Sequence, residues 1–380
     1  MQRRLITSVL LGHYLSAFTA LGIPIYLPRI LADLAPGTPG WAIGVLFVLP
    51  TLCTALAAPI WGRWADRNGC RLSLLRAHAG LFAGFLLAGF SPNLTVFVVA
   101  LIIQGTFGGA MAASNAYLST QLKDGDLSRA LNWTQYSARL AMISGPILLG
   151  LLTSHGLGLS LYSYLAWLPL LAFVLILALP DDAPKHALNG KKAAALGELP
   201  HDMPRLLAVQ FLFSFSMVVT FPYFVPFGEH LGITNDTLIG LLYSLPHLVY
   251  LLALPWVQKH QGNLLLPGLA LLAISNGLQF WGAQADSLFV LRLLSGAGML
   301  LSFVGLHRCL SQRSRRGSSG RMFGWFDSSG KWAGTAAGVS AALVSQTCGI
   351  ASPFLVACLA ATAALLLARP LLITAREIPA

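Results

Sequence analysis

Two matched pairs of polar residues carry the chemistry that this sequence suggests most directly. Gln135 precedes Arg139 by four residues, Asp327 precedes Lys331 by the same spacing, and a shift of 192 residues takes the first pair onto the second. Residues four apart share one face of a helix. Charged side chains within long apolar segments are costly and are commonly functional. Because arginine grips a carboxylate with two hydrogen bonds and lysine acts as a point charge, Arg139 and Lys331, with Gln135 beside them, predict a clamp for an anion.

The same residues allow a second interpretation. Asp327 could neutralise Lys331 as a structural ion pair on one helix, with Arg139 satisfied elsewhere. Asp327 is also the only carboxylate well inside an expected span, so it is the first candidate for a proton carrier. His247 and His13 are the alternatives because histidine titrates near neutral pH, although a lone histidine in a helix is often a packing residue.

Aromatic side chains in the apolar segments could line the same cavity or form belts at the membrane surface. Tyr14, Tyr136 and Tyr243 are the three that we place with the anion-binding residues, together with His247. Trp133 and Trp325, which the shift of 192 relates, lie near the expected inner boundary and fit a belt better. The full set of candidates is Tyr14, Tyr26, Trp133, Tyr136, Tyr223, Tyr243, Tyr250, Trp325 and Trp332.

Long apolar segments must position these residues. Of the 380 residues, 56% are apolar and only 10% are charged, which is too little charge to cover a soluble protein of this size. A membrane-spanning helix needs about 20 apolar residues, and Arg3-Arg4 before a long apolar run predicts a retained first helix rather than a cleaved signal. We expect an all-α polytopic membrane protein with twelve transmembrane helices over residues 5–32, 40–61, 72–90, 94–119, 129–153, 158–179, 205–228, 235–256, 264–283, 287–311, 321–346 and 350–373.

The positive charges are distributed asymmetrically about these spans. The net charge is +11, and all but four of the 24 Lys and Arg fall on one side of the expected topology. The four are Arg29, Arg139, Arg292 and Lys331. Cytoplasmic loops are rich in Lys and Arg, so both termini are expected inside the cell, and the basic excess reflects topology rather than nucleic-acid binding. The five cysteines are scattered without metal-ligand spacing, and we expect no metal, no disulfide framework and no cofactor.

The chain reads as two six-helix halves. A polar stretch over residues 180–204 separates an N-terminal bundle, 1–179, from a C-terminal bundle, 205–380. The halves echo each other: residues 128–133 correspond to 320–325 at a shift of 192, and Gln104-Gly105 corresponds to Ser295-Gly296 at a shift of 191. Parallel six-helix repeats are typical of transporters with a central binding site at mid-depth.

A charged stretch over residues 62–71 connects the second and third spans as a tight turn. It resembles the loop between helices two and three of the major facilitator superfamily, whose pattern is Gly-x-x-x-Asp-Arg-x-Gly-Arg-Arg/Lys. The matching residues, which we expect to form a gating loop, are Gly62, Asp66, Arg67, Gly69 and Arg71. Cys70 replaces a usual cation. An ordinary loop on the positively charged side would need neither these glycines nor the aspartate.

The fifth span carries a partial match to the family's antiporter motif, Gly-Pro-x-x-Gly-Gly. Gly145, Pro146 and Gly150 match, while Leu149 replaces a glycine and Ala141 an upstream one. Small residues permit close helix packing, and proline bends a helix at a defined point. The resemblance favours export, although the Gly and Pro content of membrane helices in general could produce a partial match.

The family's helix-four pattern, Arg-x-x-x-Gly, is displaced in this chain. Leu101 precedes Gly105 in the fourth span, whereas Arg292 precedes Gly296 in the tenth. Arg292 could take the place of the usual arginine and contact substrate, or it could extend towards the membrane edge.

The resemblance covers the whole chain and implies a secondary active transporter that works by alternating access. We expect proton-driven export of a small anionic or polycarboxylate metabolite, such as a siderophore, by a monomer in the bacterial inner membrane. Its partners are then the substrate, protons and the lipid bilayer. The runner-up is multidrug or sugar efflux with the cations tied up structurally. A membrane-embedded enzyme or a sensor is disfavoured, because no catalytic motif and no appended soluble domain is evident in the sequence.

Overall fold

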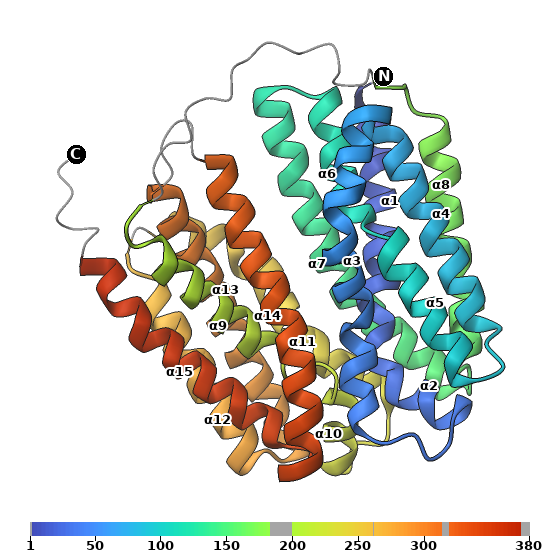
Figure 1. Ribbon diagram of the computed structural model, residues 1–380. Coiled ribbons are helices and arrows are strands. Elements are labelled where there is room, and N and C mark those ends of the chain that lie inside the picture. The colour runs from blue at the N-terminus through green and yellow to red at the C-terminus, as the bar shows by residue number, and fades with distance from the viewer. Residues whose placement is uncertain (1, 183–199, 261, 314–318, 374–380) are drawn as a thin grey trace. The chain divides into compact units, whose positions relative to one another are not determined.

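The structure is a computed structural model that describes residues 2–182, 200–260, 262–313 and 319–373 (Figure 1). Within these residues the regular structure is helical. The elements are α1 (Gln2–Gly22), η1 (Ile23–Tyr26), α2 (Leu27–Leu34), α3 (Trp41–Asn68), α4 (Cys70–Gly89), α5 (Leu94–Phe107), α6 (Ala110–Gln121), α7 (Asp124–Ser154), α8 (Ser160–Leu177), α9 (Met203–Val218), α10 (Phe224–His230), α11 (Asp236–Lys259), α12 (Leu265–Gly282), α13 (Ala285–Arg313), α14 (Ser319–Cys348) and α15 (Ser352–Ile373).

Each of the twelve expected spans coincides with one helix or with a helix that is interrupted. Ten stretches in the described residues are long and apolar enough to cross a membrane. The other two expected spans are α9, an apolar helix of 16 residues, and α14, which is 30 residues long and carries Asp327 and Lys331. The chain is thus an all-helical polytopic membrane protein.

The structure corrects the seventh expected span, which was predicted as one continuous helix, whereas the first stays one helical stretch over Gln2–Leu34 that passes through a 3-10 segment. The α-helix of the first is interrupted by η1, between α1 and α2, and the seventh is divided between α9 and α10. Each break contains the pattern Pro-x-x-x-Pro: Pro24 and Pro28 in the first, Pro222 and Pro226 in the second, at a shift of 198 residues. Proline lacks the backbone N–H that continues a helix and clashes with the preceding turn, so regular α-helix stops here in both spans.

The fourth expected span is also interrupted, between α5 and α6. Gly108 and Gly109 separate the two helices, and Gly109 has φ of +85°, a conformation that residues with a side chain rarely adopt. The corresponding span of the second half, α13, is one continuous helix. The two six-helix halves therefore differ in this helix, which is interrupted in the first half and continuous in the second.

The turn expected over residues 62–71 is much shorter than the sequence suggested. Helix α3 continues to Asn68 and α4 begins at Cys70, so Gly69 alone lies outside a helix. Gly69 has φ of +100°, and this single residue is enough to reverse the chain. Gly62, Asp66 and Arg67 accordingly lie on the last turns of α3 rather than in a loop.

Backbone contacts divide the described residues into two compact units. Unit 1 comprises residues up to 182 together with Asn235–Ser244, and unit 2 comprises residues 200–234 and 245–373. The first part of α11 thus belongs to unit 1, although the rest of that helix belongs to unit 2. Most of the linker expected over residues 180–204 lies outside the described residues.

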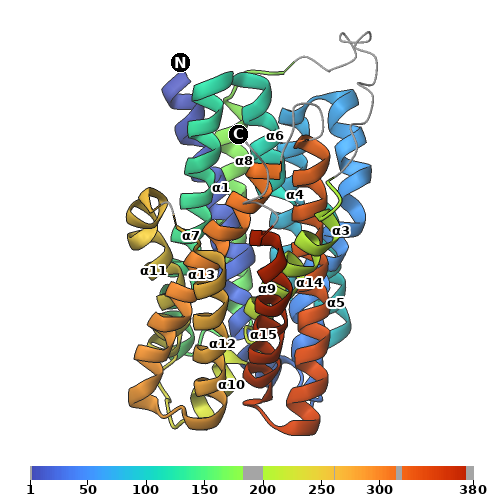
Figure 2. The same ribbon diagram turned by 90° about the vertical axis from the view of Figure 1, so that its left-hand side faces the viewer.

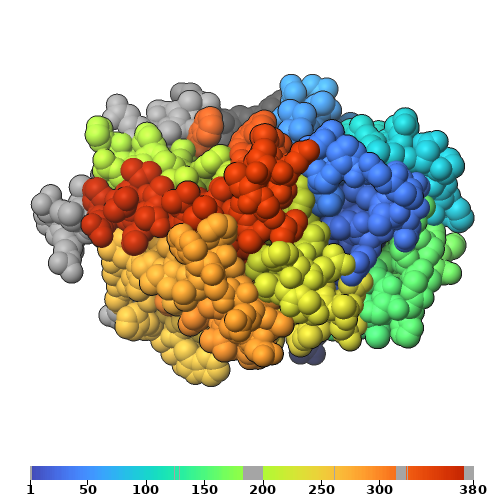
Figure 3. All heavy atoms as spheres, turned by 90° about the horizontal axis from the view of Figure 1, so that it is seen from below, coloured from blue at the N-terminus to red at the C-terminus, as the bar shows by residue number. Residues whose placement is uncertain are grey.

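In unit 1, α1 packs against α6, α7 and α8, and α4 packs against α5 and α8 (Figure 1). At one end of this unit α2, in blue, lies beside the green segment that begins α8 (Figure 3). The Asp33 carboxylate there approaches Gly158 in the α7–α8 connection. Unit 2 is built around α12, which packs against α13 and α15, while α9 packs against α14 and α15 (Figure 2). In the α12–α13 contact, Gly298 faces the backbone of Leu272, as expected for closely packed membrane helices.

Candidate functional site

The two predicted anion-binding cations lie near the middle of long helices. Arg139 is half-buried on α7, and Lys331 is exposed on α14. Lys331 Nζ lies 2.8 Å from an Asp327 carboxylate oxygen, with side chains 47% and 68% exposed. The ion pair of the second interpretation is therefore present. Both side chains are largely exposed at the surface of the protein, so burial among other side chains does not hold this pair together.

The other residues predicted to bind the anion in unit 1 lie on α7 and α1. Gln135 is exposed on the same helix, and the ring of Tyr136 lies 5.5 Å from that of Trp133. Tyr14 on α1 reaches across to α7, where its hydroxyl lies 2.7 Å from Ser144 Oγ. Gln135 and Tyr136 thus lie on the same helix as Arg139, and Tyr14 contacts that helix from α1.

The histidine His13 is buried between α1 and α7, with Nδ1 2.7 Å from Ser137 Oγ. A second histidine, His78 on α4, was not singled out from the sequence. Its Nδ1 lies 3.1 Å from Ser16 Oγ on α1, and its buried Nε2 has no hydrogen-bond partner among the described residues. Nothing in the sequence pairs His78 with α1, because the contact joins helices that are 62 residues apart.

The candidates in unit 2 are buried among aromatic rings. His247 is 2% exposed and meets the ring of Phe221 edge-on, with centroids 6.4 Å apart. Arg292 is 4% exposed, and its guanidinium carbon lies 4.6 Å from the centre of the Phe224 ring. The arginine is thus held inside the unit rather than extended to the membrane edge, and a cation over an aromatic face gains electrostatic stabilisation.

The residues of the resembled loop divide into two groups. Gly62, Asp66 and Arg67 are exposed on α3. Gly69 and Arg71 contact the segment that follows α8. The Asp182 carboxylate accepts hydrogen bonds from the backbone N–H groups of Cys70 and Arg71, at 2.5 and 2.9 Å, and so satisfies the free start of α4. Arg71 also pairs with Asp181.

The residues that match the antiporter motif create close contacts on α7. A side chain at Gly145 would press on Gly22, and one at Gly150 would overlap the Tyr26 hydroxyl and the Asp236 backbone carbonyl. The Pro146 carbonyl accepts a hydrogen bond of 2.5 Å from Tyr26 Oη. These residues therefore form a surface against which η1 and the start of α11 pack.

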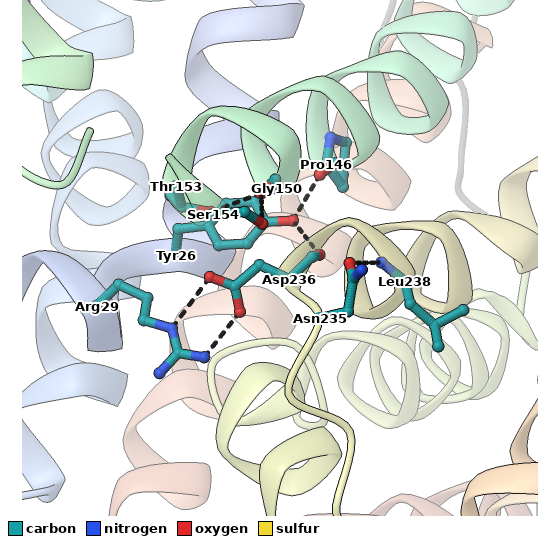
Figure 4. A network of polar contacts seen from close by, with 9 residues as sticks. All are labelled: Tyr26, Arg29, Pro146, Gly150, Thr153, Ser154, Asn235, Asp236 and Leu238. Atoms are coloured by element: carbon teal, nitrogen blue, oxygen red, sulfur yellow. Dashed lines mark hydrogen bonds and ion pairs between the residues drawn. The ribbon is translucent and has the colours of Figure 1, made fainter. Parts of the chain in front are cut away.

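A polar network at this surface was not predicted (Figure 4). Arg29 on α2 donates two hydrogen bonds to Asp236, from Nη2 at 2.7 Å and from Nε at 3.2 Å. Tyr26 Oη also lies within 3.2 Å of the Asp236 backbone carbonyl. The available signal was the exclusion of Arg29 from the cytoplasmic set of cations, together with an aspartate at the opening of the eighth span.

Known proteins resemble the chain in both sequence and fold. Residues 9–274 match the sequence profile described as the Major Facilitator Superfamily. Multidrug resistance protein MdtG of Salmonella arizonae is 29% identical over 157 residues, which are 40% of this chain and 39% of that protein. The same protein of Salmonella newport matches equally. The chain thus aligns with about two fifths of the length of these relatives.

Three solved structures share the fold over almost the whole chain. The human organic anion transporter MFSD10 (TETRAN) superposes with a TM-score of 0.68 at 19% identity, covering 96% of this chain and 99% of that one. The nucleoside transporter NupG, in a mutant form, gives 0.76 at 13% identity, covering 97% and 99%. The D-xylose-proton symporter gives 0.75 at 15% identity, covering 96% of both. At these identities the likeness concerns the fold.

Proposed function

The chain belongs to the major facilitator superfamily of membrane transporters, and we propose that it exports a small anionic or polycarboxylate metabolite, driven by protons. A carboxylate siderophore is one cargo of this class. The observation that carries the proposal is the placement of Arg139 and Lys331 at repeat-related positions near the middle of α7 and α14. Cations retained at such positions in a membrane protein commonly serve the transported species.

The geometry around each cation supports binding of an anion. Arg139 offers a planar set of donors that suits a carboxylate, with the amide of Gln135 one turn away. Lys331 is held by Asp327 in an exposed pair, which an anionic cargo can displace at small cost. The Asp327 carboxylate then competes with the cargo for the same ammonium group.

Asp327 is the proposed proton carrier. A carrier must exchange its proton with water during the cycle, and Asp327 is 68% exposed whereas His247 and His13 are 2% and 3% exposed. The two histidines remain alternatives that would need a conformational change to reach water. Asp327→Asn, which removes the titrating group but keeps the shape, is expected to uncouple transport from the proton gradient.

Multidrug efflux is the second candidate function, favoured by the similarity to MdtG. In that case the cations would serve structure, and the cargo would be a lipophilic or cationic compound. The matches to the antiporter motif at Gly145, Pro146 and Gly150 support export under either function. We propose the bacterial inner membrane as the location, with both termini inside and the monomer as the working form.

A comparison of culture media tests the cargo class. Small molecules released by cells with the wild-type protein would be compared with those of a deletion strain and of strains with Arg139→Ala or Lys331→Ala, in iron-limited and iron-replete growth. Arg63→Ala is the matched control, since Arg63 is exposed on α3, outside the proposed clamp.

We expect an anionic compound whose release falls about tenfold or more in the deletion strain and in both clamp variants, but not in the control. Equal release from the clamp variants, at equal amounts of folded protein, would contradict the anion clamp. Retention of ethidium by the deletion strain, with anion release unchanged, would favour multidrug efflux instead.

A further inference from the structure

The start of α11 is docked against η1 and α7 by backbone-to-backbone packing. A side chain at Gly240 would overlap the Pro146 carbonyl, and one at Gly150 would overlap the Asp236 carbonyl, so the two helices approach without side chains between them. These contacts involve Asn235–Ser244, the part of α11 that groups with unit 1.

Ser244 completes the docked segment at its far end. Its hydroxyl oxygen lies 2.7 Å from the Gly240 carbonyl of its own helix, and 3.1 and 3.3 Å from the Ile143 and Met142 carbonyls of α7. Pro146 has no N–H to donate to the Met142 carbonyl four residues earlier, so α7 itself does not satisfy that carbonyl. The single proton of the Ser244 hydroxyl is shared among these three carbonyls, so α11 places a donor beside the carbonyls of α7 that precede Pro146.

An ion pair secures this docked segment at the first residue of α11. The Asp236 side chain is 7% exposed and receives two hydrogen bonds from the Arg29 guanidinium, whose side chain is 34% exposed (Figure 4). A buried carboxylate is costly unless a partner compensates its charge. Arg29 supplies that partner only while the start of α11 stays in place, so the ion pair and the docking stabilise each other.

Tyr26 adds a connection between three chain segments. Its side chain is fully buried, and its hydroxyl lies 2.5 Å from the Pro146 carbonyl of α7 and 3.2 Å from the Asp236 carbonyl of α11. A hydroxyl has one proton, so these two acceptors share it. A carbonyl oxygen has two lone pairs, and each acceptor can therefore take this bond in addition to one within its own helix.

We infer that Tyr26, Arg29 and Asp236 form a latch that holds the start of α11 on unit 1 and must release it in each transport cycle. Helix α11 leaves unit 1 after Ser244 and continues in unit 2, so it is the helix through which a change in one unit reaches the other. We name these three residues the α11 latch. They act as positioning residues, through the helix, and do not contact the cargo.

The chemistry of the α11 latch suits a contact that opens and closes. One partner, Arg29, is a third exposed, so the protein does not enclose its guanidinium on every side. An ion pair of this kind is directional enough to fix the docked position and weak enough to be broken repeatedly, unlike a fully buried pair. The inference rests on membership of the transporter family and not on the cargo proposed above.

Reciprocal thiol labelling tests the α11 latch without a known cargo. Two reporters are introduced separately into the full chain: Ser244→Cys, buried in the docked segment, and Gln135→Cys, exposed on α7. A membrane-impermeant maleimide is applied to intact cells to label the Ser244→Cys reporter from outside. It is applied to inside-out vesicles to label the Gln135→Cys reporter from the inner side. Mass spectrometry reads the modified peptide, which separates it from the five natural cysteines.

Latch variants Arg29→Gln, Asp236→Asn and Tyr26→Phe are each combined with each reporter. We expect labelling of the Ser244→Cys reporter from outside to rise about fivefold or more, and labelling of the Gln135→Cys reporter from inside to fall by a similar factor. Opposite changes report a shift between two states of a folded protein, which a loosened structure would not produce.

Two results would overturn the inference. Unchanged labelling of both reporters would show that the pair does not control the position of α11, and a rise at both would show loosening of the fold. Tyr26→Phe keeps the shape of the side chain and both charges, so it carries the test if a charge variant fails to fold. If the wild-type protein exports no anion but the latch variants show the expected opposite changes in labelling, only the cargo proposal is contradicted.

Discussion

The two proline-containing breaks occupy related positions in the two halves, yet their side chains make different contacts. Residues 23–28 in unit 1 correspond to 221–226 in unit 2 at a shift of 198 residues. Tyr26 corresponds to Phe224, and Arg29 to Phe227. In unit 1 these positions bind the start of α11 through a hydroxyl and a guanidinium. In unit 2 the Phe224 ring lies under Arg292, and the Phe227 ring packs 4.4 Å from that of Phe354.

This difference distinguishes side chains that both breaks need for packing from polar groups that are present only in unit 1. Both breaks are produced by the prolines, and both are filled by large side chains, so an aromatic at the position of Tyr26 is sufficient for packing. The hydroxyl of Tyr26 and the charge of Arg29 are additional. They bind Asp236 at the start of α11. The polar network is thus a feature of one half, as expected for a contact with a role in the cycle.

The largest effect is expected where backbones touch. Gly240→Ala places a methyl group on the Pro146 carbonyl and should destabilise the protein by about 1–3 kcal/mol or more, as overpacking does. Gly334→Ala on α14 is the control, because nothing lies within 4 Å of a Cβ there and alanine favours a helix. The apparent midpoint of thermal unfolding in detergent measures both. Equal midpoints would show that the close docking is not required for stability.

A smaller effect is expected from removing one charge of each ion pair. Asp236→Asn leaves Arg29 partly buried without its carboxylate and should cost about 1–3 kcal/mol, because solvent compensates a third-exposed arginine only in part. Asp327→Asn breaks an exposed pair and should cost less than about 1 kcal/mol. The midpoints of thermal unfolding of the two variants show which ion pair contributes more to stability. The reverse order would mean that the Asp327 pair is the structural one.

Among the changes to the α11 latch and its docking, the smallest effect is expected from making unit 1 resemble unit 2. Tyr26→Phe removes a hydroxyl shared by two carbonyls and should cost about 1 kcal/mol, the usual net worth of a hydrogen bond. Tyr14→Phe is the matched control, since it removes a part-buried bond to Ser144. The unfolding midpoint of the Tyr14→Phe protein should fall less. A larger loss at Tyr14 would argue that the α1–α7 contact, and not the α11 latch, holds this region.

Much of the architecture could be predicted because it depends on local sequence. Apolar runs and short polar connections place the helices, and the resemblance over residues 62–71 and 145–150 indicates the family. The 3-10 segment at Pro24 and the interruption at Pro222 were missed because an apolar run continues through them, and hydropathy does not register a lost N–H donor. The turn was predicted too long for the opposite reason: charged residues on the last turns of α3 were taken for a loop.

The candidate site could be predicted only where partners lie close in sequence. Asp327 and Lys331 are one helical turn apart, and that ion pair was foreseen as one of two interpretations. Arg29 and Asp236 are 207 residues apart, so only the packing of α11 brings them together. The same holds for His78 and Ser16, which join two helices of unit 1.

Charge exchange tests the central claim most directly. Arg29→Asp and Asp236→Arg would be made singly and together in the protein that carries the Ser244→Cys reporter, and labelling from outside would be timed. We predict fast labelling in both single variants and a return to within about twofold of the unexchanged protein when the charges are swapped together, as coupled residues require. Labelling of the double variant as fast as that of the single variants would contradict an ion pair that controls release of α11.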